Sequence, residues 1–231
     1  MAVLECMQLT KRYGNITALD HINLSLEPGR IVGLVGPNGS GKTTLIKLAQ
    51  HLLTPTEGHI LIGGMEPGAR TKGFVSYLPD RDFLPAWMNV ESMLDFYEDF
   101  YRDFDAGRAL QMLQALDIDP RMAFKKLSKG NREKVQLIMT MSRNAGIYLL
   151  DEPIAGVDPA ARDFILRTII SNYSENALVL ISTHLIADVE PVLDEVVFLK
   201  QGHIELHENV DALRGRTGMS VDGYFREVYR C

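Results

Sequence analysis

The hydrophobic pattern of the first sixty residues predicts short strands. Residues 21–26 alternate polar and apolar side chains, whereas residues 30–35 form an apolar run without alternation, as expected for a strand buried on both faces. Further strands are predicted at 3–9 and 59–62, and residues 42–53 have the pattern of a helix. A strand, a glycine-rich loop and a helix therefore follow one another early in the chain.

The middle of the chain has a helical pattern. From about residue 89, large apolar and aromatic residues recur at helical spacing, namely Met93, Phe96, Tyr97, Phe100, Tyr101 and Phe104. This spacing predicts a helix with one aromatic face, and two more helices are predicted near residues 110–116 and 128–144. Together the three helices predict an insert between two parts of an α/β core.

After the insert, strands and helices alternate again. The predicted strands are 147–150, 178–182, 196–200 and 203–206, and the predicted helices are 159–171 and 185–193. This alternation is typical of an α/β fold. The expected organisation is one domain over residues 1–231, with a core of about 1–82 and 145–231 and a helical insert of about 83–144.

Composition and charge narrow the class of protein. The 231 residues are 46% hydrophobic and 23% charged, which is typical of a globular chain that buries a core. A net charge of −6 argues against nucleic acid as a partner, because nucleic acid is bound by basic surfaces. The two cysteines, Cys6 and Cys231, lie at opposite ends without metal-ligand spacing. No uncharged run is long enough to span a bilayer, so we expect a cytoplasmic protein.

The strongest motif is the glycine-rich loop. Residues 36–43 match the P-loop pattern, which requires a strand before it and a helix after it. Glycines let successive backbone N–H groups point at phosphate oxygens, the lysine reaches the β- and γ-phosphates, and the threonine hydroxyl binds Mg²⁺. The alternative is a glycine-rich turn without a ligand. The expected nucleotide-binding residues are Gly36, Asn38, Gly39, Ser40, Gly41, Lys42, Thr43 and Thr44.

Two adjacent acids end the buried strand predicted at 147–150. A P-loop enzyme needs a carboxylate at such a position to hold Mg²⁺, and Asp151 is the expected ligand beside Thr43. Glu152 is then placed to polarise the water that attacks the γ-phosphate, with Lys42 on the phosphate itself. An apolar strand ending in two acids is ordinary by itself, so this prediction depends on the P-loop.

The order of these motifs resembles the ATP-binding subunit of an ABC transporter over essentially the whole chain. The resemblance rests on Tyr13, the P-loop, residues 127–131, the strand that ends at 151–153, residues 155–158 and residues 182–184. It implies a P-loop NTPase core of the ABC ATPase type, an antiparallel β subdomain and an inserted α-helical subdomain. It also implies that the protein is an ATPase whose cofactors are ATP and Mg²⁺.

The resemblance assigns roles to residues outside the P-loop. It implies that Tyr13 stacks on adenine and that His184 senses the γ-phosphate. It also implies that Ser128 and Gly130 contact the γ-phosphate bound by an opposing subunit, and it places Asp158 at the seam between the subunits. Each has an alternative interpretation: Tyr13 as a surface aromatic residue, Ser128 as a helix N-cap, and His184 as a core histidine.

Two positions depart from the family pattern. Lys129 stands where the family's signature usually has a glycine, although Gly130 is retained. The family's switch glutamine aligns with Asp80, which adds a charge near Mg²⁺ and makes Asp80 a candidate metal ligand. With these departures and its aromatic stripe, the chain is similar to Ytr-type ATPases of Gram-positive bacteria, which are associated with export or with the response to cell-envelope stress.

The resemblance favours an ATPase that powers a membrane transporter, and the Ytr-type likeness favours an exporter. Two ATP-binding subunits, as a homodimer or a heterodimer, are expected to sandwich two ATP molecules. An integral membrane subunit would hold them at the inner face of the cell membrane. The alternative is a soluble ABC-type ATPase that acts on a cytosolic assembly. A GTPase is disfavoured because the sequence has no Asn-Lys-x-Asp motif for guanine.

Residues 83–88 place several large apolar side chains in a predicted loop, where exposure would be unusual. One interpretation is that they pack under the helical insert as a small core. The other, which the resemblance strengthens, is that part of the stretch lines a groove for a short helix of a membrane subunit. Trp87, the only tryptophan, is expected to be partly exposed in the isolated chain.

Overall fold

A central, mostly parallel sheet organises the chain, which this computed structural model describes at residues 2–229 apart from the side chains of 159–161. The strand order is β5-β6-β7-β3-β8-β9, and the pairs are parallel except for β8 with β9. The bounds are Arg30–Val35 for β3, Val75–Leu78 for β5, Ile147–Asp151 for β6, Leu178–Thr183 for β7, Glu195–Lys200 for β8 and His203–Asn209 for β9. The buried β3, β6 and β7 therefore end at one edge of the sheet, where ligands of open α/β sheets bind.

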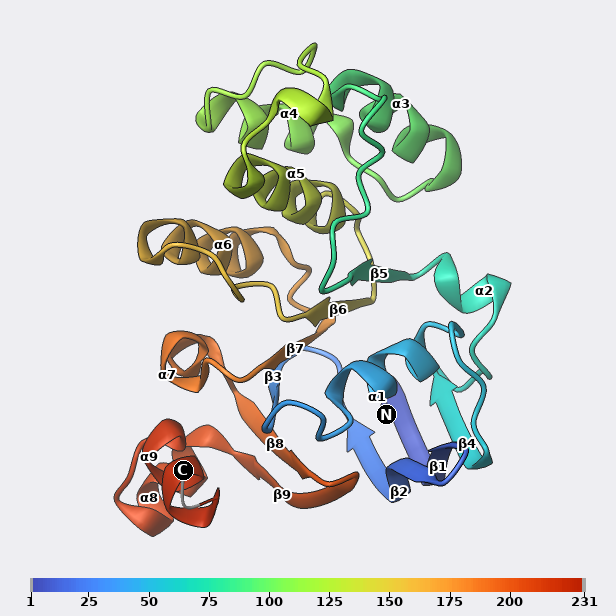
Figure 1. Cartoon of the computed structure of the whole chain (residues 1–231), viewed down its shortest axis with the longest axis vertical. Helices are drawn as coiled ribbons and strands as arrows, with labels where there is room; N and C mark the ends of the chain where they lie inside the picture. Colours follow the sequence, from blue (N-terminus) through green and yellow to red (C-terminus); the bar gives the residue numbers. More distant parts are fainter. Residues whose placement is uncertain (1, 230–231) are drawn as a thin grey trace.

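A smaller antiparallel sheet lies beside the central one (Figure 1). Its strands run in the order β2-β1-β4, with bounds Leu4–Tyr13 for β1, Ile16–Leu26 for β2 and Glu57–Ile62 for β4. β1 and β2 are longer than the predicted strands because they form a hairpin whose turn uses Gly14 at a φ of +57°. Leu45 and Leu48 of helix α1 (Lys42–Ala49) lie in the core that both sheets share.

Helices α3 (Val90–Phe100), α4 (Ala106–Ala115) and α5 (Lys129–Met141) gather at the opposite end of the molecule from the antiparallel sheet (Figure 1). Their buried apolar residues form a separate core. The first turn of each helix donates a backbone N–H to a side-chain oxygen, and the three capping residues are Asn89, Asp105 and Ser128. The three predicted helices of the middle region are confirmed.

The predicted aromatic face of α3 is divided between core and surface. Tyr97 and Phe104 pack against the core of the insert. Phe96 and Phe100 instead stack on each other outside, with ring centres 4.4 Å apart and exposed fractions of 44% and 69%. The helix ends at Phe100, so the single aromatic stripe expected up to residue 104 is wrong.

The remaining helices of the core pack, together with part of α5, on the face of the central sheet opposite α1. They are α6 (Pro159–Asn172), α7 (Ile186–Val189), α8 (Val210–Thr217) and α9 (Val221–Tyr229). The hydrophobic pattern missed α8 and α9, and it also missed β5 and the one-turn helix α2 (Ala69–Lys72). Among the helices of residues 2–229, none combines the length and the apolar character needed to cross a bilayer.

Candidate active site

The P-loop connects β3 to α1, as predicted. Its glycines permit close approach of the backbone, because a Cβ on Gly36 would lie 2.1 Å from the carbonyl oxygen of Leu199. A Cβ on Gly41, whose φ is +113°, would lie 2.5 Å from the carbonyl oxygen of Ala18. The loop therefore turns tightly into the N-terminus of α1, where free N–H groups and the helix dipole favour an anion.

Lys42 is buried within the loop. Its Nζ donates hydrogen bonds to the carbonyl oxygens of Gly36 at 2.8 Å and Pro37 at 3.4 Å, and it lies 3.5 Å from Oε1 of Glu152. A buried ammonium needs such partners because desolvation disfavours its charge. A phosphate oxygen, as a charged acceptor, would replace the two carbonyls favourably.

Asp151 ends β6 and is completely buried. Its Oδ1 accepts hydrogen bonds from Oγ of Ser182 at 2.6 Å and Oγ1 of Thr43 at 3.1 Å, whereas its Oδ2 has no hydrogen-bond partner among the described residues. Burial raises the pKa of this carboxyl; the two hydroxyl donors oppose the rise, and the charges of Asp80 and Glu152 add to it. An unpaired carboxylate oxygen beside a threonine hydroxyl fits Mg²⁺, which takes oxygen ligands and completes its shell with phosphate and water.

Glu152 follows Asp151 with a φ of +52°, a left-handed conformation that is costly for a residue with a side chain. Its N–H donates to the carbonyl oxygen of Ser182 at 3.0 Å and to the Ser182 hydroxyl at 3.1 Å. Its Oε2 lies 2.9 Å from Nδ1 of His184. This backbone turn directs the carboxylate toward Lys42 on one side and His184 on the other.

Ser182 is a site residue whose role the sequence reasoning missed. It pairs with Asp151 in the register of β6 and β7, and its hydroxyl bonds both the Asp151 carboxylate and the Glu152 backbone. The available signal was its position two residues before His184, at the end of a buried strand. Recognising the role of Ser182 requires knowing that β6 and β7 are neighbours in the sheet, and no local sequence pattern indicates this.

Asp80 lies just beyond the end of β5 and is exposed. It lines a cavity of about 170 Å³ together with Glu152, Lys129 and Arg132. Its charge contributes to the raised pKa of Asp151, so the two carboxylates act on each other. The structure thus brings the predicted switch residue close to Asp151 and Glu152.

Four residues named by the resemblance lie on other elements. Tyr13 ends β1 at the hairpin turn and is 45% exposed. Ser128 is the N-cap of α5, where its Oγ accepts the N–H of Asn131 at 3.2 Å, and Gly130 lies in the first turn of the same helix. Asp158 is exposed in the loop before α6. The N-cap interpretation of Ser128 is confirmed, and it is compatible with anion binding at the helix N-terminus.

Some residues of the stretch 83–88 fit the interpretation as a small core, and Trp87 fits the interpretation as an exposed surface. Leu84 is buried in the core of the insert, and Phe83 and Met88 pack against that core. Trp87, in contrast, is 81% exposed. The apolar residues are therefore largely a small core, and the tryptophan is the part left open to solvent.

Comparison with known proteins identifies the family. The family model described as ABC transporter matches residues 19–155, which is more than half of the chain. This chain belongs to the ABC transporter family. ABC ATP-binding domains are ATPases, and this ABC subunit is an ATP-binding, ATP-hydrolysing protein of the type that works with a membrane transporter partner. The predicted family, fold class and ATPase activity are confirmed.

The ABC subunit is similar to several transporter proteins over most of its length. It is 27% identical over 215 residues to the ABC transporter ATP-binding protein YtrB of Bacillus subtilis (strain 168), covering 92% of this chain and 74% of YtrB. It is 28% identical over 211 residues to the SkfA peptide export ATP-binding protein SkfE of the same organism, covering 88% of each chain. A solved ATP-binding subunit of an ABC transporter superposes with a TM-score of 0.89 at 26% identity, over 98% of this chain and 99% of that one.

Proposed function

We propose that this ABC subunit binds ATP with Mg²⁺ at the P-loop and hydrolyses it to drive an exporter. The observation that carries the proposal is the position of Glu152. Its carboxylate lies 3.5 Å from Nζ of Lys42 and 2.9 Å from Nδ1 of His184, directly after the buried Asp151. An anion-binding loop, an acid suited to Mg²⁺ and a candidate base thus meet at one edge of the central sheet.

Binding uses the groups that the P-loop supplies. The backbone N–H groups of residues 39–44 bind the phosphates, and Lys42 exchanges its carbonyl partners for the β- and γ-phosphates. Thr43 and Asp151 would hold Mg²⁺, which when bound neutralises charge on the phosphate oxygens. Tyr13, half exposed at the hairpin turn, offers a ring face for stacking of the adenine base.

Hydrolysis uses the pair formed by Glu152 and His184. Glu152 accepts a proton from the attacking water, a contribution of about 10²- to 10⁴-fold in rate. His184 fixes the carboxylate through Nδ1 and turns its other ring nitrogen toward the γ-phosphate. Asp80 lines the same cavity as Glu152 and adds a ligand oxygen or a water contact there.

A second ATP-binding subunit completes the site in this proposal. Ser128 and Gly130, at the start of α5, contact the γ-phosphate held by the opposing subunit, and Asp158 lies at the seam. The chain acts as one ATP-binding domain, 1–231, whose helical insert of about 83–144 carries the signature residues. A membrane subunit follows the closing and opening of the pair, and the peptide-export name of SkfE supports export as the direction.

The test is Glu152→Gln. The amide keeps the shape of the side chain but removes the base, so hydrolysis stalls and the ATP-bound pair accumulates. We expect sedimentation to show a shift from monomer toward dimer when ATP and Mg²⁺ are added to the variant. Glu133→Gln is a matched control, because Glu133 lines the cavity beside Glu152 without a proposed role in the reaction.

Two results would count against the proposal. Wild-type turnover in Glu152→Gln would move the base role to Asp80 or His184. An ATP-driven dimer that persists in a Glu152→Gln, Lys42→Ala double variant would show that dimerisation does not depend on nucleotide in the P-loop.

A further inference from the structure

The loops that carry the two candidate catalytic groups follow neighbouring strands. β6 continues through Glu152 into the loop that ends at α6, and β7 continues through His184 into α7. The direct contact between the two loops is the 2.9 Å approach of Glu152 Oε2 and His184 Nδ1. His184 is 42% exposed, so packing alone restricts its ring only in part.

Arg162 joins these two loops by a second route. It lies in the first turn of α6, and its side chain is about three-quarters buried. Its Nε donates to the carbonyl oxygen of Val157 at 3.0 Å, in the loop that follows Glu152. Its Nη1 donates to Oδ2 of Asp188 at 2.8 Å, in α7, which begins two residues after His184. Because the guanidinium is a rigid planar fork, the two bonds fix the distance between the loops.

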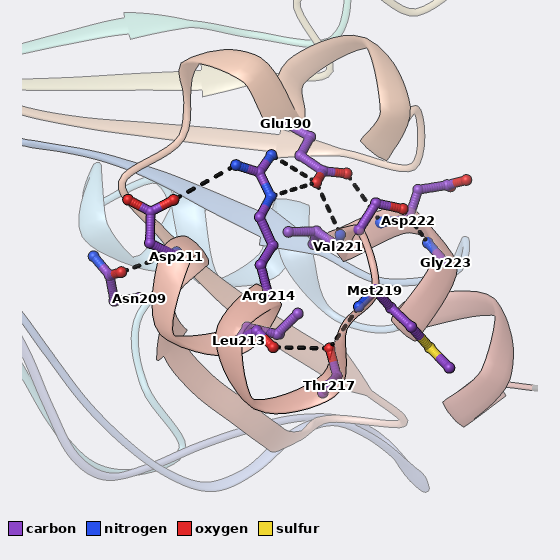
Figure 2. A network of polar contacts seen from close by, with 11 residues as sticks. Glu190, Asn209, Asp211, Leu213, Arg214, Thr217, Met219, Val221, Asp222 and Gly223 are labelled. Atoms are coloured by element: carbon purple, nitrogen blue, oxygen red, sulfur yellow. Dashed lines mark hydrogen bonds and ion pairs between the residues drawn. The ribbon is translucent and has the colours of Figure 1, made fainter.

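Glu190, the residue that directly follows α7, forms a second anchor, as Figure 2 shows. Its carboxylate accepts hydrogen bonds from Arg214 Nη2 at 2.7 Å and Nε at 3.1 Å in α8, and from the backbone N–H groups of Val221 at 3.0 Å and Asp222 at 3.2 Å in α9. Burial opposes the charge of Glu190, but these donors outweigh burial and lower its pKa. The C-terminal helices therefore fix the far end of α7.

These two anchors matter because α7 has only four residues, too few to be a stable helix by itself. Its position, and with it the position of His184, depends on the contacts that hold it from outside. Glu190, directly after α7, is held by the C-terminal helices, away from the reaction. Arg162 holds α7 itself, through Asp188, against the loop that begins at Glu152.

We propose that Arg162 is a positioning residue for ATP hydrolysis, which sets the distance between Glu152 and His184 by binding Val157 and Asp188 at the same time. The inference rests on the proposed roles of Glu152 and His184. Arg162 acts through the loops of Glu152 and His184 and not on the nucleotide, so it affects the rate of turnover and leaves ATP binding unchanged.

The test compares kcat and KM in Arg162→Met, which keeps the aliphatic part of the side chain but removes its donors. We expect kcat to fall by about tenfold, less than the roughly hundredfold cost of misplacing reacting groups by about 1 Å. KM for ATP should stay within about twofold. Asp188→Leu should lower kcat to the same extent, and the double variant should be no worse than either single one, because both remove one bridge.

Arg216→Met is the matched control, because it breaks another arginine–carboxylate pair, Arg216 with Glu208 at 2.6 Å, on the surface away from the reaction. Its kcat and KM should equal those of the wild type. Asp188→Asn, which keeps an acceptor oxygen and is the milder change, should recover most of the turnover lost in Asp188→Leu, and it serves as the second variant should Arg162→Met fold poorly.

The outcomes separate this inference from the proposed function. Wild-type turnover in Glu152→Gln overturns the proposed site. Loss of turnover in Glu152→Gln with wild-type kcat in Arg162→Met overturns the positioning role alone. A rise in KM as large as the fall in kcat, or additive effects of Arg162→Met and Asp188→Leu, would also overturn it, because either result means a general structural role.

Discussion

Two of the buried polar clusters, one around Arg143 and one around Asp151, differ in how fully their atoms are paired. All three guanidinium nitrogens of Arg143 donate hydrogen bonds, at 2.7 to 3.4 Å. Its partners are the carboxylate of Asp103, the carbonyl oxygens of Lys72, Gly73 and Val75, and the ring of Tyr101, which it stacks against at 3.9 Å. This cluster joins the end of α5 to the start of β5 and is complete without a ligand.

The Asp151 cluster is incomplete by comparison. Among the described residues, Oδ2 of Asp151 and Oγ of Ser40 are buried without a hydrogen-bond partner. An unpaired buried polar atom costs free energy, so two such atoms, one in the P-loop and one at the end of β6, are suited to a ligand that pairs with them. The fully paired cluster around Arg143 holds elements of the fold together, whereas the partly paired cluster around Asp151 is suited to binding a ligand.

Arg143→Met should have the largest effect of the substitutions that test this comparison, and the effect is on the stability of the fold. The substitution leaves the Asp103 carboxylate and three backbone carbonyls without their donor, and the free energy of unfolding should fall by about 3–5 kcal/mol. Urea unfolding measures the loss. Arg216→Met, which removes an exposed ion pair, should unfold like the wild type. A loss of less than about 1 kcal/mol in Arg143→Met would mean that the complete cluster does not hold the insert to the core.

Asp151→Asn should have a smaller effect than Arg143→Met, and it should raise the free energy of unfolding where Arg143→Met lowers it. Affinity for Mg²⁺ should fall on the order of 10- to 100-fold with turnover, because a charged ligand oxygen is lost. Without nucleotide the variant should be more stable than the wild type. Burial raises the pKa of Asp151 in the folded chain, so its ionisation destabilises the fold. The gain should therefore widen as pH rises from the ordinary carboxyl pKa toward the raised one and level off above it. Urea unfolding across a pH series without Mg²⁺ measures it.

The smallest effect is expected outside both clusters, at Trp87. Because it is 81% exposed, Trp87→Ala should change the free energy of unfolding by less than about 0.5 kcal/mol and leave ATP binding as it is. Fluorescence of the single tryptophan should be quenched by acrylamide in the isolated chain and protected when a membrane subunit is co-purified. Full shielding in the isolated chain, or unfolding of Trp87→Ala, would place this residue in the core of the insert.

The sequence offered candidates for the chemistry of the active site but not the contacts between them. Lys42, Asp151, Glu152 and His184 were proposed because each belongs to a motif with a local pattern, and the structure brings them together. Their contacts depend on the strand order β6-β7-β3, which pairs residues more than thirty positions apart. Ser182 and Arg162 were missed for this reason, since their roles follow from neighbouring strands and loops and from no motif of their own.

The fold was predictable where hydrophobic periodicity is long and was missed where it is short. β5 has four residues and α2 one turn, so neither offers enough positions to define a period. The C-terminal helix α9 was missed although its aromatic residues Tyr224, Phe225 and Tyr229 all pack around Phe198 of β8. Those contacts are made across the sheet edge, and the sequence shows the aromatic residues without showing their target.

The left-handed backbone of Glu152 creates a trade-off between stability and activity at a single position. A side chain in this conformation costs on the order of 1–3 kcal/mol, and glycine would remove most of that cost. Selection for thermal stability alone would therefore favour glycine at 152, whereas the proposed role of Glu152 as the base favours glutamate under selection for turnover. A directed-evolution experiment that selects for higher thermal stability of this ATPase should keep glutamate at residue 152 and seek stabilising substitutions at other positions.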